Sequence, residues 1–273
     1  MYKGFELKLD ETDFLLNDGE YSKLLREGQG NIVNQLNEVL LSNGKIDADK
    51  IIEEWFPSGR YHVFISHSHK DLELAEKLAN WLHQNFRLTS FLDSHIWGYA
   101  NDLLRYLNDK YARSGESTYA YDPTISNAAH VYLMLSTALT EVIDKSECLF
   151  FINTQNTLDN MKFEGGQEEA RTGSPWIMHE LKTSAMIRRH SSEDRMVVTA
   201  RNVSNESLEK SSNFSFSVPT EHLSRIDKNC LLSWLKECDE IYENVWGKSS
   251  FKCKRAKKYE FDALDVLYNL SKG

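Results

Sequence analysis

The feature that most constrains the fold of this chain is a change in the spacing of its apolar residues just after residue 60. Residues 61–66 form an apolar run of β-forming side chains, and apolar residues then recur at helical spacing from Leu74 to Leu82. A buried strand that feeds a helix opens a βαβ unit, which requires a parallel sheet. Residues 88–93 supply the next predicted strand, and a right-handed crossover places it beside the first.

The rest of the chain continues this alternation of strands and helices. Further strands are predicted at residues 148–153, 195–201 and 215–219. Helices are predicted at residues 102–111, 130–144, 175–189 and 231–245. The pattern therefore predicts an α/β fold with a flavodoxin-like, open, parallel five-stranded sheet flanked by helices.

The first 58 residues are predicted to be mainly helical. Apolar residues from Ile32 to Leu40 follow helical spacing, Ile51 to Trp55 suggest a second short helix, and a Pro-Ser-Gly sequence at 57–59 then punctuates the chain. A basic stretch near the end precedes a short amphipathic segment at 261–270. We therefore predict three parts, listed by residue: an N-terminal helical region at 1–58, an α/β domain at 59–248 and a basic, helical C-terminal tail at 249–273.

Composition and charge disfavour several classes of function for this chain. A formal net charge of -9 disfavours broad electrostatic binding to nucleic acid or to an anionic membrane. No signal peptide and no long apolar span is evident, and the four cysteines lack C-x-x-C spacing. The histidines at 62, 67 and 69 have no cysteine or carboxylate partner at ligand spacing, so no metal site is predicted. We expect a cytoplasmic protein with reduced thiols.

The candidate site lies where strands end, because open parallel sheets bind ligands beyond the carboxyl ends of their strands. Residues 66–69, 93–98 and 153–174 meet this condition, and the last includes a long polar connection at 154–173. Ser174 and Pro175 then open a helix that carries Glu180 in its second turn. Glu180 shares a face with Trp176, and a carboxylate beside an indole in a closed cleft is poised for chemistry.

Four segments, taken in order, resemble a TIR (Toll/interleukin-1 receptor) domain. Residues 61–71 resemble its first strand, which ends in a serine before an aspartate opens the first helix. Residues 91–98 resemble its second strand and BB loop, and residues 138–152 its next helix and strand. The sequence Ser-Pro-Trp-Ile-Met-His-Glu-Leu at 174–181 resembles the family segment S-x-W-C-x-x-E-L, with Ile177 in place of the frequent cysteine. The insertion at 112–128 and the connection at 154–173 exceed the compact family pattern.

This resemblance implies the TIR fold and an NAD+-consuming activity. In enzymatic TIR domains the corresponding glutamate is catalytic, which places that role on Glu180. No cofactor is implied, since NAD+ is the substrate. The other residues expected to bind substrate are Ser66, His67, Ser68, Asp93, Trp97, Ser174 and Trp176. Asp93 is also expected to orient the BB loop, and the connection at 154–173 to act as a lid that keeps water out and so selects the product.

The resemblance also implies partners and a setting. Stand-alone bacterial TIR enzymes act in antiphage defence, as in Thoeris systems, where an ADP-ribose-derived nucleotide activates a separate effector. Self-association through the TIR domain is expected. Two alternatives remain: a non-enzymatic TIR adaptor that acts through homotypic contacts, and an enzyme like the nucleoside deoxyribosyltransferases, which share the sheet topology and a single glutamate.

Overall fold

The computed structural model describes residues 2–9, 21, 46–55, 61–162, 168–187, 215–246 and 260–271. Its centre is a parallel sheet with helices on both faces, as predicted. The strands of this sheet are β1 (Lys3–Lys8), β2 (Val63–Ser66), β3 (Ser90–Leu92), β4 (Cys148–Ile152) and β8 (Leu223–Asp227). The helices are α2 (Ala48–Trp55), η2 (His69–Asp71), α3 (Leu72–Phe86), α4 (Ser94–Tyr111), α5 (Tyr121–Lys145), α6 (Pro175–Met186), α7 (Lys228–Trp246) and α8 (Glu260–Leu270).

The strand order is β3-β2-β4-β1-β8, and every pairing is parallel. The chain runs outward from β2 to β3 and then crosses back to place β4 on the other side of β2. The winding direction therefore reverses between β2 and β4, and the carboxyl ends of these two strands flank the switch point at which such sheets bind ligands. This arrangement is flavodoxin-like, with the fourth position of the sheet filled by the first strand of the chain.

Residues 1–58 were predicted to be mainly helical, and this prediction is wrong for the first residues of that range. Lys3–Lys8 forms β1, which lies between β4 and β8 in the sheet. Phe5 and Leu7 are buried on one face, which is the period-two pattern of a strand, and the intervening Glu6 is buried as well. The short helix near Ile51 is confirmed as α2, while the predicted helix at 32–40 lies outside the described residues.

Each face of the sheet packs against its own set of helices. One core joins alternate strand residues such as Phe5 and Phe150 to α3, α7 and α8. The other joins Phe64, Leu149 and Phe151 to α2, α4, α5 and α6. α8 confirms the predicted helix near the C-terminus. This helix is part of the domain and not a separate tail, because its buried residues belong to the first core and Tyr268 stacks on Phe5. The predicted basic stretch before it lies outside the described residues.

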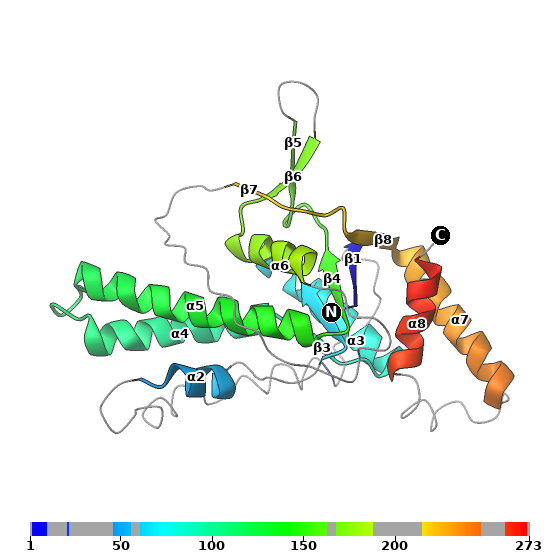
Figure 1. The fold of residues 1–273 in the computed structure, drawn as a ribbon, viewed down its shortest axis with the longest axis horizontal. Helices are drawn as coiled ribbons and strands as arrows, with labels where there is room; N and C mark the ends of the chain where they lie inside the picture. The colour runs from blue at the N-terminus through cyan, green and yellow to red at the C-terminus, as the bar shows by residue number, and fades with distance from the viewer. Residues whose placement is uncertain are drawn as a thin grey trace.

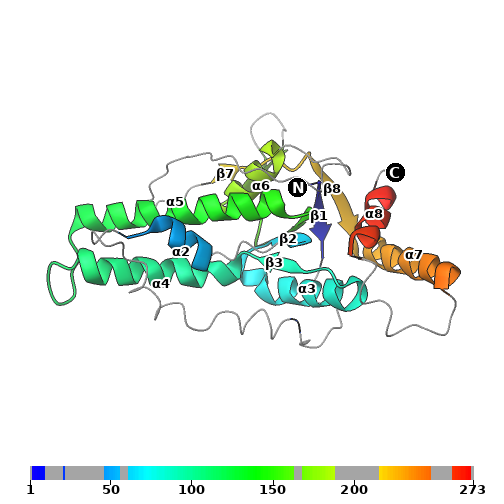
Figure 2. The same ribbon diagram turned by 60° about the horizontal axis from the view of Figure 1, so that its bottom comes forward.

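Two long helices and a small second sheet extend from this centre. α4 and α5 run side by side as a hairpin that projects from the β3 end of the sheet, while α7 and α8 lie at the β8 end (Figures 1 and 2). α4 starts directly after Asp93, so residues 94–98 are helical and do not form the extended BB loop that the resemblance implied. α5 begins at Tyr121, so the predicted loop insertion at 112–128 is confined to the short connection before it.

The connection predicted as a loop at 154–173 contains a β-hairpin. β5 (Asp159–Lys162) and β6 (Glu168–Thr172) pair antiparallel, and β7 (Phe216–Ser217) adds to β6. The strand predicted at 215–219 therefore exists as β7, but it joins this small sheet, and β8 is the fifth strand of the main sheet. The strand predicted at 195–201 lies outside the described residues. Within the described part of the chain, no helix is both long and apolar enough to cross a membrane.

Candidate active site

Four of the predicted site residues meet at the carboxyl end of β2. Ser66 is the last residue of β2 and His67 follows it, Asp93 stands between β3 and α4, and Glu180 comes from α6. All four are buried. α6 holds its place because Ser174 caps its first turn, Pro175 occupies the first helical position, and Ile177 and Leu181 pack into the core. The structure thus brings together four of the eight residues predicted for the site.

Glu180 is fully buried, and its two carboxyl oxygens have different surroundings. Oε2 accepts a hydrogen bond of 2.6 Å from the Ser66 hydroxyl. Oε1 has no hydrogen-bond donor among the described residues, although the Asp93 carboxyl is a hydrogen-bonding neighbour of Glu180. Two carboxyl groups form a hydrogen bond only when one of them carries a proton, because an ionised carboxylate only accepts.

These surroundings favour the neutral form of Glu180. Burial and the charge of neighbouring Asp93 raise the pKa of Glu180 well above its ordinary value, and the Ser66 hydrogen bond only partly opposes them. Such a shift, in a group placed at a ligand-binding edge of a parallel sheet, is typical of functional carboxylates.

His67 connects the carboxyl pair to the start of α4. Its Nδ1 lies 3.1 Å from Asp93 Oδ1 and 3.1 Å from the Ile65 carbonyl oxygen, and its Nε2 lies 3.0 Å from Ser94 Oγ. Burial alone would lower the pKa of His67, but the charge and hydrogen bond of Asp93 outweigh it, and the pKa is raised. His67 and Asp93 thus form a buried ion pair when the imidazole is protonated. Ser94 is a member of the cluster that the sequence prediction missed.

A third buried carboxyl group, that of Asp71, connects the turn after β4 to the same edge of the sheet. Its oxygens accept hydrogen bonds of 2.5 Å from Thr154 Oγ1 and 2.7 Å from Asn156 Nδ2. Asp71 also acts electrostatically on His67. From the sequence, Asp71 is expected only to open a helix. Its position five residues after the end of a buried strand was the available signal.

Ser68 and Ser174 have capping roles. The Ser68 hydroxyl accepts a hydrogen bond from the Lys70 amide at the start of η2, and the Ser174 hydroxyl accepts one of 3.3 Å from the Ile177 amide. Among the described residues, no hydrogen bond joins either serine to Glu180. The structure therefore does not bring them together with the carboxyl cluster, although Ser174 positions it by starting α6.

The structure describes the surroundings of only one of the two predicted tryptophans. Trp176 is half-buried, and its ring centroid lies 6.0 Å from that of Tyr132 in α5. It packs at the margin of the core that includes α6. Trp97 lies in the first turns of α4, and its side chain is outside the described part of the structure. Stacking of a substrate ring on either tryptophan stays a prediction.

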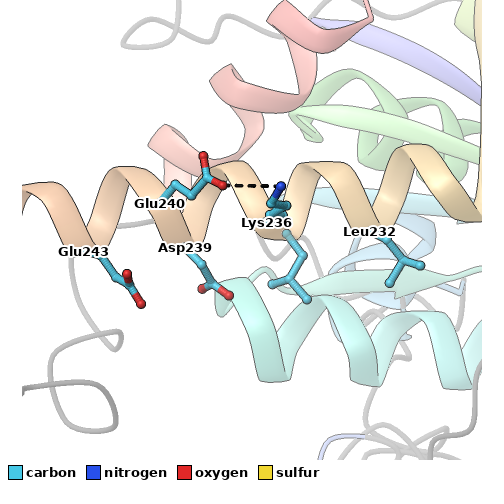
Figure 3. Close-up of a pocket in the computed structure, with 6 residues that line it drawn as sticks. Leu232, Lys236, Asp239, Glu240 and Glu243 are labelled. Carbon is cyan, nitrogen blue, oxygen red and sulfur yellow. Dashed lines mark ion pairs between the residues drawn. The ribbon is translucent and has the colours of Figure 1, made fainter. Parts of the chain in front are cut away.

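A surface hollow lies elsewhere, along α7. It is lined by Leu232, Leu235, Lys236, Asp239, Glu240 and Glu243, and an ion pair of 3.6 Å joins Lys236 to Glu240 (Figure 3). All of its lining residues come from one helix face, and none of them belongs to the predicted site. It adds no residue to the candidate chemistry.

The donor set at the cluster does not form a metal site. Within the described residues, no group of three or more His, Cys, Asp or Glu side chains is arranged to hold a metal ion.

No family model, curated protein or solved structure matches the chain.

Proposed function

We propose that this protein is a TIR-like enzyme that cleaves the bond between nicotinamide and ribose in NAD+, with Glu180 as the catalytic carboxylate. The observation that carries the proposal is the position of Glu180, a fully buried carboxyl group held by Ser66 beside the switch point of a parallel sheet. The second support is the order of four TIR-like segments in the sequence, one of which contains Glu180.

The proposed reaction breaks the bond between C1′ of the ribose and the nicotinamide nitrogen, and the electron pair leaves with nicotinamide. Because nicotinamide departs as a neutral base, no strong general acid is needed. Positive charge develops on the ribosyl ring, and an ionised Glu180 in this low-dielectric site stabilises it, as carboxylates do in sugar hydrolysis. Ser66 holds the carboxylate in place throughout.

The attacking group then decides the product. Water gives ADP-ribose after loss of a proton, an adenine nitrogen gives a cyclic isomer, and another nucleophile gives a conjugate. The β5–β6 hairpin takes the role of the lid expected for residues 154–173, because it lies between β4 and α6 and leads directly into the cap of the helix that carries Glu180. Its exclusion of water would favour the last two products.

Substrate access to Glu180 requires a movement of the protein. Glu180 has no exposed surface, so a dinucleotide reaches it only if a covering segment moves. We propose that self-association of the protein favours this open state, so that the unassembled protein rests inactive. In this role the enzyme works in the cytoplasm and produces an ADP-ribose-derived signal for a separate effector in antiphage defence.

One experiment separates this function from the alternatives. Purified full-length protein, Glu180→Gln and the matched control Ser184→Ala are incubated with NAD+ and with deoxynucleosides, with and without a crowding agent, and products are identified by mass spectrometry. Ser184 is a buried polar residue of the same helix whose hydroxyl bonds to His222 and to the Leu181 carbonyl, with no hydrogen bond to either carboxyl group among the described residues. We expect wild type and Ser184→Ala to release nicotinamide and Glu180→Gln to lose at least about 100-fold in rate.

Each alternative has its own outcome in this assay. Base exchange between deoxynucleosides without NAD+ cleavage would indicate an enzyme like the deoxyribosyltransferases. Self-association with no turnover of either substrate would indicate an adaptor. Equal NAD+ consumption by wild type and Glu180→Gln would overturn the assignment of the catalytic residue.

A further inference from the structure

The contact between Asp93 and Glu180 has a chemical requirement of its own. Both carboxyl groups are almost completely buried, and they are hydrogen-bonding neighbours. Glu180 Oε1 has no donor among the described residues, while Oε2 is already occupied by Ser66. Two adjacent carboxylates that both ionise would repel each other in a low-dielectric site, so one proton between them satisfies Oε1 and removes the repulsion.

With that proton in place, the charges of Asp93, Glu180 and a protonated His67 balance one another. His67 contacts Asp93 and forms an ion pair with it when protonated, which the raised pKa of His67 favours. Asp71 acts electrostatically on His67 from η2 and has its own hydrogen bonds to Thr154 and Asn156. With Asp93 ionised, His67 charged and Glu180 neutral, the three central groups sum to zero. Burial of an uncompensated charge is costly, which disfavours a second ionised carboxyl group beside Asp93.

We propose that Asp93 and Glu180 share one proton in the substrate-free protein, and that a cationic ring enters the site by displacing that proton. This inference rests on the proposed function and specifies its substrate class as a cationic N-ribosyl heterocycle. Exchange of a proton for a cation leaves the net charge of the buried cluster unchanged. It also leaves Glu180 ionised at the moment when positive charge must be stabilised on the ribose. A neutral ring, such as dihydronicotinamide, cannot make this exchange.

Asp93 and His67 are positioning residues in this scheme. Asp93 keeps the proton on the pair until a cation replaces it. His67 positions Asp93 through the contact at Nδ1, and Ser94 positions the imidazole through a hydrogen bond at Nε2. In this scheme the Asp93 side chain acts through Glu180. It therefore controls which redox form of the dinucleotide is accepted.

The shared proton is tested first without substrate. Infrared difference spectra between wild type and Glu180→Gln at pH 7 are expected to contain the carbonyl band of a protonated carboxyl group. Glutamine is a neutral isostere of protonated glutamate, so this variant preserves the packing. The control difference, wild type minus Ser184→Ala, is expected to lack the band. Absence of the band in the first difference overturns the inference, whether or not the protein cleaves NAD+.

The displacement is tested with two dinucleotides. The probes are carba-NAD+, an uncleavable analogue with a cationic ring, and NADH, whose ring is neutral. Calorimetry in buffers of different ionisation enthalpy is expected to detect release of about one proton with carba-NAD+ and none with NADH. As pH rises toward the pKa of the pair, the Kd for carba-NAD+ should fall by up to about tenfold per pH unit, while the Kd for NADH stays constant.

Asp93→Asn separates this coupling from a merely structural role. The variant is expected to bind carba-NAD+ with proton release and pH dependence both reduced, and circular dichroism checks that it folds. Equal proton release with carba-NAD+ and NADH, or equal release in wild type and Asp93→Asn, overturns the inference. If NAD+ is cleaved while carba-NAD+ binds without proton release, the inference fails and the proposed function stands. If the protonated band is present and NAD+ is neither bound nor cleaved, the proposed function and the substrate class fail together.

Discussion

The Ser66 hydroxyl donates a hydrogen bond of 2.6 Å to Glu180 Oε2, which joins the end of β2 to a helix 114 positions later in the chain. Both partners are fully buried. This contact fixes one oxygen of the carboxyl group, while Oε1 has no hydrogen-bond donor among the described residues. It is also the part of the surroundings that favours ionisation of Glu180, since it opposes the pKa increase caused by burial and by Asp93.

Substitution of Ser66 by alanine tests this contact. The variant should be less stable by about 1–3 kcal/mol, because a buried acceptor loses its donor. Loss of the hydrogen bond also raises the pKa of Glu180 further, so the acid limb of the pH profile for NAD+ cleavage should move to higher pH. Urea unfolding and kcat/KM between pH 5 and 9 measure the two effects. Ser184→Ala is the matched serine control, and an unmoved acid limb in Ser66→Ala would contradict the assigned role of this bond.

The raised pKa of Glu180 predicts a specific dependence of stability on pH. The unfolded-state pKa of a glutamate is about 4.3, and the folded protein binds the proton more tightly. The stabilising contribution is therefore complete below about pH 4.3 and is lost as pH rises through the folded-state pKa. The raised pKa of His67 adds a loss of the same sign above about pH 6.5.

Glu180→Gln isolates the Glu180 contribution. Its free energy of unfolding, measured in urea from pH 4.5 to 8, should fall less steeply with pH than that of wild type. Glu116→Gln is the control, because Glu116 is an exposed glutamate in the α4–α5 connection and should leave the slope unchanged. A Glu180→Gln slope equal to or steeper than that of wild type would argue that Glu180 is ionised in the folded protein.

The interior position of β1 predicts that the N-terminal residues are essential for folding. Phe5 is fully buried, with its ring centroid 5.4 Å from that of Phe150 and 6.1 Å from that of Tyr268. Phe5→Ala should reduce the free energy of unfolding by about 3–5 kcal/mol. Ile241→Ala, at an exposed apolar residue of α7, should change it by less than about 0.5 kcal/mol. Similar effects for the two variants would place residues 3–8 outside the folded core.

The β5–β6 hairpin is expected to decide how much product is hydrolysed. Replacement of residues 159–172 by a short Gly/Ser linker, with the Ser174 cap retained, should admit water and raise the fraction of linear ADP-ribose relative to cyclic or conjugated products. Mass spectrometry of products from the variant and from wild type gives this ratio. The Ser174 amide normally donates to Thr172 Oγ1, so α6 helicity is checked by circular dichroism. An unchanged product ratio in a folded, active variant would assign product selection to other residues.

Local sequence was sufficient to predict much of this protein. The apolar runs at β2, β3 and β4 predicted buried parallel strands, because strands covered on both faces are apolar throughout. The Ser-Pro start of α6 predicted its first turn, because a capping hydroxyl and a proline at the first helical position are local signals. The same pattern selected Ser66, His67, Asp93 and Glu180 from the segments that follow strands.

Other features were decided only by tertiary structure. Lys-Gly-Phe-Glu-Leu-Lys at β1 contains charges and a glycine that give no clear strand signal, and its place between β4 and β8 depends on pairing with residues more than 140 positions away. The hairpin at β5–β6 likewise depends on cross-strand pairing. The sequence by itself determined that Glu180 follows a strand on a capped helix. Only the packing of α6 against the sheet buried its carboxyl group beside Asp93, and that burial gives Glu180 its raised pKa.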